Sequence, residues 1–163
     1  MSYKKNSGLS KIDKSVTISD SSLVVTVGLT YSKLFNFSLK RANDMFVEKK
    51  SFLNALYDIK SIESAKQLGV MSIDEDGNVV AFEEKPEEPK STFVSLGIYF
   101  IPQEKVVDFS KYLSEGKDPD KIGYFWVWVL EQGTPFYGYV YEEKWFDIGW
   151  MQALEEARRD FEG

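Results

Sequence analysis

The sequence predicts an α/β fold with a mixed, mainly parallel sheet flanked by helices, and three consecutive segments support this prediction. Residues 23–27 are an apolar run rich in β-branched residues that ends at Gly28, which is typical of a strand buried on both faces of a parallel sheet. A helical pattern follows over residues 38–50, and a second apolar run follows over residues 52–57. A strand, a helix and a strand in this order predict a right-handed parallel crossover.

The length and composition predict one globular domain. The chain has 163 residues, of which 43% are hydrophobic and 28% are charged, and folding at this size buries roughly two-thirds of the unfolded chain's surface. The first residues are polar and aperiodic, so we expect a flexible segment over residues 1–18 and one α/β domain over residues 19–163. The aromatic residues, 15% of the chain, fit a large core, a carbohydrate-stacking surface or an oligomer interface.

Charge and residue usage exclude several classes of function. The net charge of -6 argues against a nucleic-acid-binding face, which needs basic residues. There is no cysteine, which excludes disulfides and thiol chemistry, and no histidine, which removes the usual near-neutral base and every imidazole ligand. No apolar segment is long enough to span a membrane and the N-terminus has no apolar signal core, so we expect a cytoplasmic protein.

A helix and a hairpin are the next predicted elements. The helix over residues 38–50 begins at Ser38, a residue that suits a capping position, and carries one apolar stripe. The stripe consists of Leu39, Ala42, Met45 and Phe46. Strands over residues 70–73 and 79–84 flank an acidic turn, where Asp-Gly at residues 76–77 predicts a hairpin because this pair tolerates positive φ. A calcium loop is the alternative, but the turn lacks the length and the final glutamate of an EF-hand.

A longer strand over residues 93–101 has two different faces, one wholly apolar and one with small residues in its middle. The apolar face holds Val94, Leu96, Ile98 and Phe100, and the other holds Phe93, Ser95, Gly97 and Tyr99. Helices over residues 102–113 and 121–132, a strand over residues 136–141 and a last helix from Trp150 complete the pattern. The helix over residues 121–132 is apolar nearly all round, so it is either buried or lies at an interface.

Charged residues at the predicted strand ends are candidates for ligand binding. Glu84 shares a strand face with Val80 and Phe82, so it is either an acceptor for sugar hydroxyls or a carboxylate that is paired with Lys85 or solvated. Lys85 precedes Pro86, which predicts an extended backbone from which the ammonium group can meet a phosphate. A solvated lysine is the ordinary alternative.

Two further positions combine a small or charged residue with apolar neighbours. Ser95 and Gly97 leave a bare patch on a bulky strand, which either admits a ligand to the backbone or accommodates a neighbouring aromatic side chain. Asp147 lies between Phe146 and Ile148 just before a helix, so it is either a helix cap or a metal ligand. One carboxylate alone does not define a magnesium site.

Eight short runs occur in the order in which they are found in the sugar-1-phosphate nucleotidyltransferases, the pyrophosphorylases that make nucleotide sugars. They are FNFSLK at residues 35–40, ALYDI at 55–59, LGV at 68–70, DG at 76–77, EKP at 84–86, GIY at 97–99, EQG at 131–133 and WFDIG at 145–149. No single run is specific, but the ordered series, which spans about residues 23–161, resembles this family.

The resemblance implies a Rossmann-like nucleotide-diphospho-sugar transferase fold. It also implies transfer of a nucleoside monophosphate from a nucleoside triphosphate to a sugar-1-phosphate, with release of pyrophosphate. The sugar-phosphate-binding residues that it implies are Gly69, Glu84, Lys85, Val94 and Gly97. Among these, Glu84 would accept hydrogen bonds from sugar hydroxyls and Lys85 would hold the sugar's phosphate. Asp147 would bind Mg²⁺.

Two departures from the family's pattern imply a truncated member, a partial nucleotidyltransferase-like domain that is catalytically impaired by itself. Residues 1–20 contain no counterpart of the Gly-rich loop that grips the nucleotide's phosphates. The family strand that matches residues 23–27 ends in Gly-Asp, where the aspartate is the other magnesium ligand. Here Leu29 follows Gly28, and an apolar side chain cannot coordinate a hard cation. Trp150 also stands where the family usually has a small or hydroxyl residue.

Three hypotheses for function remain open. The chain is an enzyme, or the remnant of one, that retains the sugar-phosphate half of the site; or it is a non-catalytic sugar-phosphate-binding module; or it is an interaction subunit whose missing half comes from another copy or another polypeptide. Uncovered sheet edges and apolar surfaces invite pairing, which predicts a homo-oligomer, most simply a two-fold dimer. We expect no nucleic-acid partner and no membrane partner.

Overall fold

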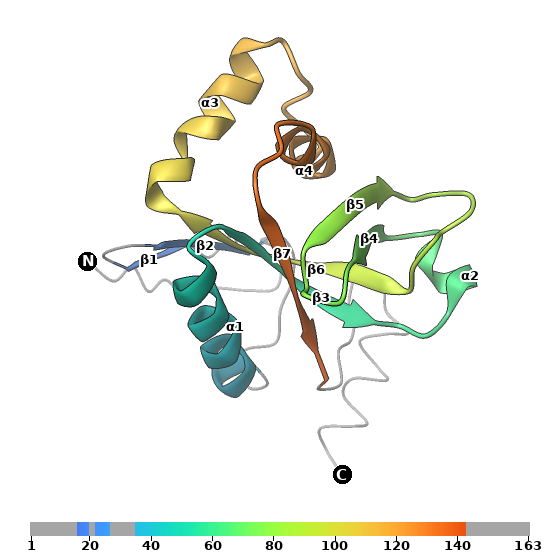
Figure 1. The fold of residues 1–163 in the computed structure, drawn as a ribbon. Helices are drawn as coiled ribbons and strands as arrows, with labels where there is room; N and C mark the ends of the chain where they lie inside the picture. Colours follow the sequence, from blue (N-terminus) through green and yellow to red (C-terminus); the bar gives the residue numbers. More distant parts are fainter. Residues whose placement is uncertain (1–15, 20–21, 27–34, 143–163) are drawn as a thin grey trace, which may run out of the picture.

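A seven-stranded mixed sheet organises the part of the chain that the computed structural model describes, which comprises residues 16–19, 22–26 and 35–142 (Figure 1). The strands are β1 (Val16–Ser19), β2 (Ser22–Thr26), β3 (Phe52–Asp58), β4 (Gly69–Ile73), β5 (Val79–Glu84), β6 (Phe93–Pro102) and β7 (Phe136–Tyr141). The helices are α1 (Phe35–Lys49), α2 (Ile62–Ala65), α3 (Val107–Ser114) and α4 (Ile122–Glu131), and one 3-10 turn, η1 (Gln103–Lys105), precedes α3.

The strands pair mainly in antiparallel fashion, so the expectation of a mainly parallel sheet is wrong, whereas the mixed α/β class is confirmed. The hydrogen-bonded order is β1-β2-β6-β3-β7, and β4 pairs with both β5 and β6. Among the described strands, β3 and β7 form the one parallel pair. The physical reason is that β6 runs between β2 and β3 and is antiparallel to both. Strands β2 and β3 therefore point in the same direction, as the predicted crossover requires, without being hydrogen-bonded neighbours.

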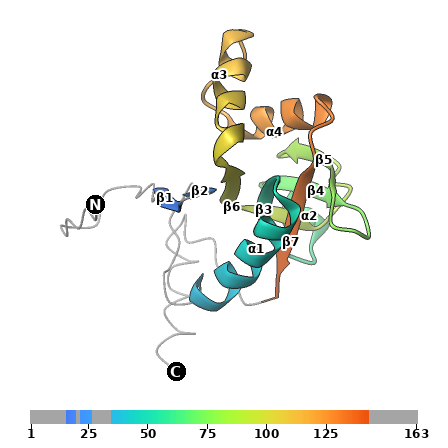
Figure 2. The same ribbon diagram turned by 60° about the vertical axis from the view of Figure 1, so that its left-hand side comes forward.

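Side-chain alternation along β3 divides the core into two layers on opposite faces of the sheet. Phe52 and Leu56 pack in a cluster with residues of α3 and α4, whereas Leu53 and Ala55 pack in a cluster with residues of α1. Figure 2 shows α1 beside β3 and β7 and well apart from α3 and α4. Each face of the sheet thus has its own helical cover.

The centre of the first layer is the indole of Trp126, which is fully buried. Its ring centroid lies 5.5 Å from that of Phe52, 4.8 Å from that of Phe136 and 4.6 Å from that of Tyr99. Aromatic pairs at these separations stabilise a core beyond the area that they bury. The apolar helix α4 is therefore part of the core of this chain. Of the two alternatives for this helix, burial and an interface, the structure supports burial.

A register shift in the β4–β5 hairpin overturns one detail of the predicted pattern. Val79 is buried, whereas Val80 is 60% exposed, so Val80 does not share the apolar face with Phe82. The pairing moves by one residue between Ser72, which faces Ala81, and the next residue of β4, which faces Val79. Such a bulge turns the extra residue out of the alternation.

Most other elements lie within a few residues of their predicted positions. The hairpin turn is confirmed, with Gly77 at a φ of 79°. The helix expected over residues 102–113 is divided into η1 and α3, and neither β1 nor α2 was predicted. The helix expected from Trp150 lies outside the described residues.

Replacing Trp126 with alanine should lower the free energy of unfolding by about 3–5 kcal/mol, because removing a buried aromatic side chain leaves a cavity. The control on the same helix is Tyr124→Ala, which removes a side chain that is 44% exposed and should cost about 1 kcal/mol or less. Urea unfolding monitored by circular dichroism measures both changes. Equal losses in the two variants would contradict the central place of Trp126 in the core.

Candidate functional site

The edge where β4, β5 and β6 meet brings together most of the described candidate residues. Gly69, the first residue of β4, pairs with Glu84, the last residue of β5. The backbone N–H of Lys85 donates a hydrogen bond to the carbonyl of the residue before Gly69, at 3.0 Å. Val94 near the start of β6 pairs with the residue after Gly69. Four candidate residues from three separate stretches of the sequence therefore lie around one end of β4.

The backbone of Lys85 differs from the sequence-based expectation. Its φ is 48°, in the left-handed region rather than the extended region that a following proline favours. A non-glycine residue rarely adopts positive φ, and such conformations persist where surrounding structure enforces them. The N–H of Lys85 is hydrogen-bonded across to the start of β4, so the turn begins directly where the β4–β5 pairing ends. The ammonium group is thus attached to a fixed turn rather than to an extended strand.

Glu84 and Lys85 are both exposed. In the part of the chain that the structure describes, the ion pairs join other residues, and neither of these two charges belongs to one. The alternative in which Glu84 pairs with Lys85 is therefore not what the structure contains. Among the described residues, neither the Glu84 carboxylate nor the Lys85 ammonium group has an ion-pair partner, so each can contact a ligand. Without a ligand, both groups are solvated.

A polar cluster lies behind these charges, on the face of the sheet that α4 covers. The hydroxyl of Ser95 accepts hydrogen bonds from Nδ2 of Asn54 at 2.8 Å and from the backbone N–H of Gly97 at 3.2 Å. The same hydroxyl lies 3.1 Å from the phenol oxygen of Tyr99, and either group can donate. Asn54 and Tyr99 were not predicted as site residues. The one signal for Asn54 was an amide inside an otherwise apolar strand.

Gly97 is held in this cluster by its backbone. Its φ is 69°, and it lies in an irregular stretch of β6, since Leu56 faces Ser95 while Asn54 faces Tyr99. Positive φ favours glycine. This conformation explains Gly97 without requiring either a ligand or a neighbouring aromatic side chain, and its contact with Ser95 places it at the margin of the polar cluster.

The environment of Tyr99 favours a neutral phenol. Burial is the main cause that raises the pKa of Tyr99, the hydrogen bond with Ser95 opposes the rise, and the negative charge of Glu84 adds to it. Tyr99 therefore keeps its proton at neutral pH and can act as a hydrogen-bond donor. The electrostatic interaction also links the exposed carboxylate of Glu84 to the buried cluster.

The metal ligand expected from the sequence is not tested by these residues. Asp147 lies outside the described part of the chain, as does Leu29. Within residues 16–19, 22–26 and 35–142, no group of three or more carboxylates could hold a metal ion. The described donor set therefore does not fit a metal centre by itself.

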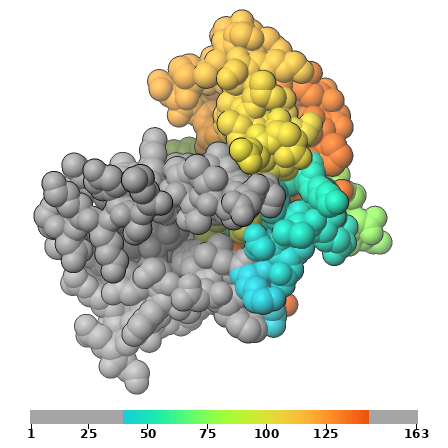
Figure 3. All heavy atoms as spheres, turned by 90° about the vertical axis from the view of Figure 1, so that its left-hand side faces the viewer, coloured from blue at the N-terminus to red at the C-terminus, as the bar shows by residue number. Residues whose placement is uncertain are grey.

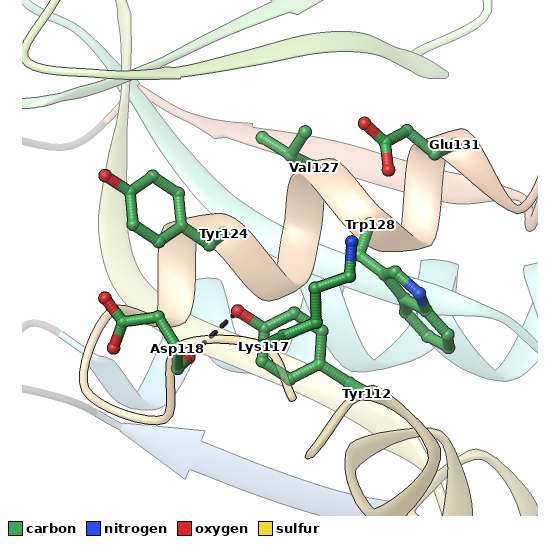
Figure 4. Close-up of a pocket in the computed structure, with 7 residues that line it drawn as sticks. All are labelled: Tyr112, Lys117, Asp118, Tyr124, Val127, Trp128 and Glu131. Atoms are coloured by element: carbon green, nitrogen blue, oxygen red, sulfur yellow. Dashed lines mark hydrogen bonds between the residues drawn. The ribbon is translucent and has the colours of Figure 1, made fainter. Parts of the chain in front are cut away.

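A hollow of about 220 Å³ lies between α3, the loop after it and α4 (Figure 4). Its lining residues are Tyr112, Lys117, Asp118, Tyr124, Val127, Trp128 and Glu131. Two lining side chains donate hydrogen bonds, the Tyr112 hydroxyl to the carbonyl of Asp118 at 2.9 Å and Nε1 of Trp128 to Glu115 at 2.9 Å. None of the residues predicted for sugar-phosphate binding lines it, so the hollow is separate from the strand edge.

A model of the nucleotidyl transferase family matches residues 12–163 of the sequence. The chain belongs to this family. Enzymes of the family act on a sugar-1-phosphate and a nucleoside triphosphate, and they generally use a divalent metal ion. No helix among the described residues of this nucleotidyl transferase family member is long and apolar enough to cross a membrane.

Two relatives of this family member are glucose-1-phosphate adenylyltransferases. The enzyme from Clostridium novyi (strain NT) is 31% identical over 134 residues, which are 81% of this chain and 33% of the relative. The enzyme from Ruminiclostridium cellulolyticum is 29% identical over 136 residues, which are 81% of this chain and 30% of the relative. The chain therefore spans about a third of the length of these relatives.

A solved structure has a similar fold. It is a protein from Bacillus anthracis assigned as a glucose-1-phosphate thymidylyltransferase, in complex with a sucrose. The TM-score is 0.64 at 23% sequence identity, and the match covers 86% of this chain and 54% of the other. At this identity the likeness shows the fold alone, and it agrees with the mixed α/β sheet described above.

Asp58 joins the end of β3 to the start of β6 at the same strand edge. Its Oδ1 accepts a hydrogen bond from Oγ1 of Thr92 at 2.6 Å and one from the backbone N–H of Lys60 at 2.9 Å. The Thr92 hydroxyl is the main cause that lowers the pKa of Asp58, followed by the Lys60 N–H. A lowered pKa in the folded state means that the ionised carboxylate stabilises the fold.

We predict that Asp58→Asn weakens the dependence of stability on acid pH. An unperturbed aspartate has a pKa of about 3.9, so the contribution of Asp58 is present above that pH and is lost as the pH falls toward its lower folded-state pKa. The wild-type free energy of unfolding should therefore fall more steeply below about pH 4 than that of Asp58→Asn. The control is Asp120→Asn, at an exposed residue that is hydrogen-bonded through its backbone. If the free energy of unfolding of Asp58→Asn fell with acid pH as steeply as that of the wild type, Asp58 would not be the stabilising carboxylate.

Proposed function

We propose that this chain binds the sugar-1-phosphate of nucleotidyl transfer at the edge where β4, β5 and β6 meet. The observation that carries the proposal is the pairing of Gly69 with Glu84, next to the turn at Lys85. It puts a carboxylate and an ammonium group on adjacent residues, neither of them in an ion pair within the described part of the chain. The half-buried hydroxyl of Ser95 and the buried phenol of Tyr99 lie behind them. Glu84 accepts hydrogen bonds from the sugar hydroxyls, and Lys85 holds the phosphate as a point charge.

The other site residues shape the sugar pocket. Gly69 leaves room beside Glu84, and Gly97 lies beyond the hydroxyl of Ser95. Val94 is fully buried with Ala65 and Val70 on the opposite face of the sheet, so its proposed role is to support the end of β4 from below. A site that combines charged groups with hydroxyl donors suits a polyhydroxylated ring carrying one phosphate, since each polar group of such a ligand needs a partner once water is excluded. This division of roles follows the family resemblance, and the proximity of Gly69, Glu84 and Lys85 supports it.

In the reaction that we propose, an oxygen of the sugar's phosphate attacks the α-phosphorus of a nucleoside triphosphate. The new phosphorus–oxygen bond forms as the bond to the leaving pyrophosphate breaks, and positioning and charge stabilisation supply most of the rate. The contribution of the described residues is to hold and orient the sugar-1-phosphate. We propose Mg²⁺ as the metal and Asp147 as one of its ligands, from the family run at residues 145–149. We also propose a cytoplasmic location, where such substrates are made.

Lys85→Ala should weaken the binding of glucose-1-phosphate by roughly tenfold or more, because a hydrogen bond to a charged group contributes about 1.5–3 kcal/mol. Isothermal titration calorimetry with glucose-1-phosphate measures the change. The control is Lys40→Ala, which removes an equal charge on α1 that is already paired with Asp44 at 2.8 Å. It should leave the affinity unchanged.

Two results would overturn this proposal. One is a wild-type protein that does not bind glucose-1-phosphate or any other sugar-1-phosphate in a panel. The other is equal weakening in Lys85→Ala and Lys40→Ala, which would indicate general charge attraction rather than a site. Release of pyrophosphate from a nucleoside triphosphate, glucose-1-phosphate and magnesium then separates an active enzyme from a binding module with the same pocket.

We also propose that the chain forms a two-fold homodimer. Large apolar side chains remain exposed on two helices that both reach the surface on the face seen in Figure 3, with Val107 63% and Leu113 50% exposed on α3 and Val47 56% exposed on α1. Exposed apolar groups of this kind favour association. The core helix α4 and the strand β7 are largely covered within the chain, so α3 is the better candidate for the contact.

Light scattering at micromolar concentration should give the mass of a dimer. The double variant Val107→Asp with Leu113→Asp should give a monomer, because it places two charges in the proposed contact. Ile62→Asp serves as the control, since Ile62 is also exposed, at 47%, but lies on α2. A monomeric wild type, or a dimer that survives the double change, would contradict the proposal.

A further inference from the structure

We propose that Phe82 is a positioning residue for Glu84 and that Gly69 and Gly123 form the slot that holds its ring. This inference rests on the proposed function, because it concerns how the carboxylate assigned to sugar binding is held. Phe82 and Glu84 are two residues apart on β5, so both side chains leave the strand on the same face. Phe82 is 7% exposed and packs in the core, whereas Glu84 is exposed. A buried ring thus lies next to the group that faces the ligand.

The slot exists because two backbones approach the ring without side chains. A Cβ at Gly69 would lie 3.0 Å from Cζ of Phe82, and a Cβ at Gly123 would lie 2.5 Å from its Cε1. Carbon atoms in favourable contact are about 3.5–4.0 Å apart. A methyl group at either glycine therefore cannot coexist with the present position of the ring. Gly69 opens β4 and Gly123 lies in the first turn of α4, so the slot joins the sheet to its covering helix.

The carboxylate of Glu84 borders the same slot. Its Oε2 would lie 3.3 Å from a Cβ at Gly69 and 3.1 Å from a Cβ at Gly123. The ring and the carboxylate therefore share the same two neighbours, and displacement of the ring takes space from the carboxylate. Fixing a flexible glutamate side chain costs rotamer entropy. The packed ring of Phe82 restricts the Glu84 side chain before the ligand binds, so less rotamer entropy is lost on binding.

The backbone of Gly123 does not explain why glycine is there. The described glycines with positive φ are Gly77, Gly97, Gly116 and Gly133. Gly123 lies in α4 with helical neighbours, where alanine is favoured over glycine. Glycine at position 123 is thus unfavourable for the helix and is not required by its backbone conformation. The space that Phe82 and Glu84 occupy beside it explains why no side chain is present there. The structure thus assigns Gly123 to the site by what it leaves room for.

A size-exchange experiment tests the slot. Gly123→Ala should weaken the binding of glucose-1-phosphate by about tenfold or more, because small misplacements of a binding group have large effects. It should also shift the carboxyl resonance of Glu84 in carbon-13 NMR of the ligand-free protein, a signal assigned by its loss in Glu84→Gln. Adding Phe82→Leu removes the ring atoms nearest the new methyl group, so the double variant should recover the wild-type resonance and most of the affinity.

The matched control is Gly138→Ala. A Cβ at Gly138 on β7 would lie 2.5 Å from Cδ1 of Leu56, which is equally crowded but involves neither Phe82 nor Glu84. This variant should lose stability while the Glu84 resonance and the affinity stay as in the wild type. An unshifted Glu84 resonance in Gly123→Ala, or no recovery with Phe82→Leu, overturns the positioning role. If the wild type binds no sugar phosphate, the proposed function fails, and the resonances of the ligand-free proteins still decide on the slot.

Discussion

The course of β6 between β2 and β3 is the constraint on which the rest of the structure depends. This strand pairs with β2, β3 and β4, and its side chains enter both core layers, Leu96 and Ile98 on the α1 side and Tyr99 and Ile101 on the α4 side. A strand that is hydrogen-bonded along both edges and packed on both faces cannot move without disrupting the whole sheet. The hydroxyl cluster on β6 is therefore held by the same interactions that hold the fold, which is the preorganisation that a binding site needs.

The site separates two tasks between buried and exposed groups. Asn54, Ser95 and Tyr99 are fixed by packing and by one another, and they offer neutral hydrogen-bonding groups. Glu84 and Lys85 supply the charges from the exposed end of the hairpin. Burying those charges would cost several kcal/mol per ion unless each were paired. Keeping them at the surface avoids this cost. In the proposed site, a phosphate and sugar hydroxyls would replace the water around these charges, and the cluster beneath would keep the geometry.

The sequence predicted what local patterns control, and it failed where distant strands decide. Apolar runs located β3 and α4, alternation along the chain located β6, an apolar stripe located α1, and the Asp-Gly turn located the hairpin with β5. The position of β6 could not be predicted, because an apolar run looks alike whether its neighbours are parallel or antiparallel. The positive φ of Lys85 departs from the extended backbone that Pro86 favours, so this local signal misled. Asn54 gave only the weak signal of one amide in an apolar run, and its partner Ser95 lies 41 residues away.

The bulge at Val80 shows how one local irregularity sets the geometry of the site. Next to the turn, Ile73 faces Val79, and an unbroken ladder from that pair would place Glu83 opposite Gly69. The extra residue moves the register by one, so that Glu84 takes this position. A one-residue slip exchanges the two faces of a strand, and the bulge therefore lets Val79 at one end and Phe82 farther along both reach the core. Glu84 then follows Phe82 on the face beside α4, which is where the two glycines leave room for it. The irregular residue far from the charges is thus the reason that the carboxylate reaches the edge shared with β4.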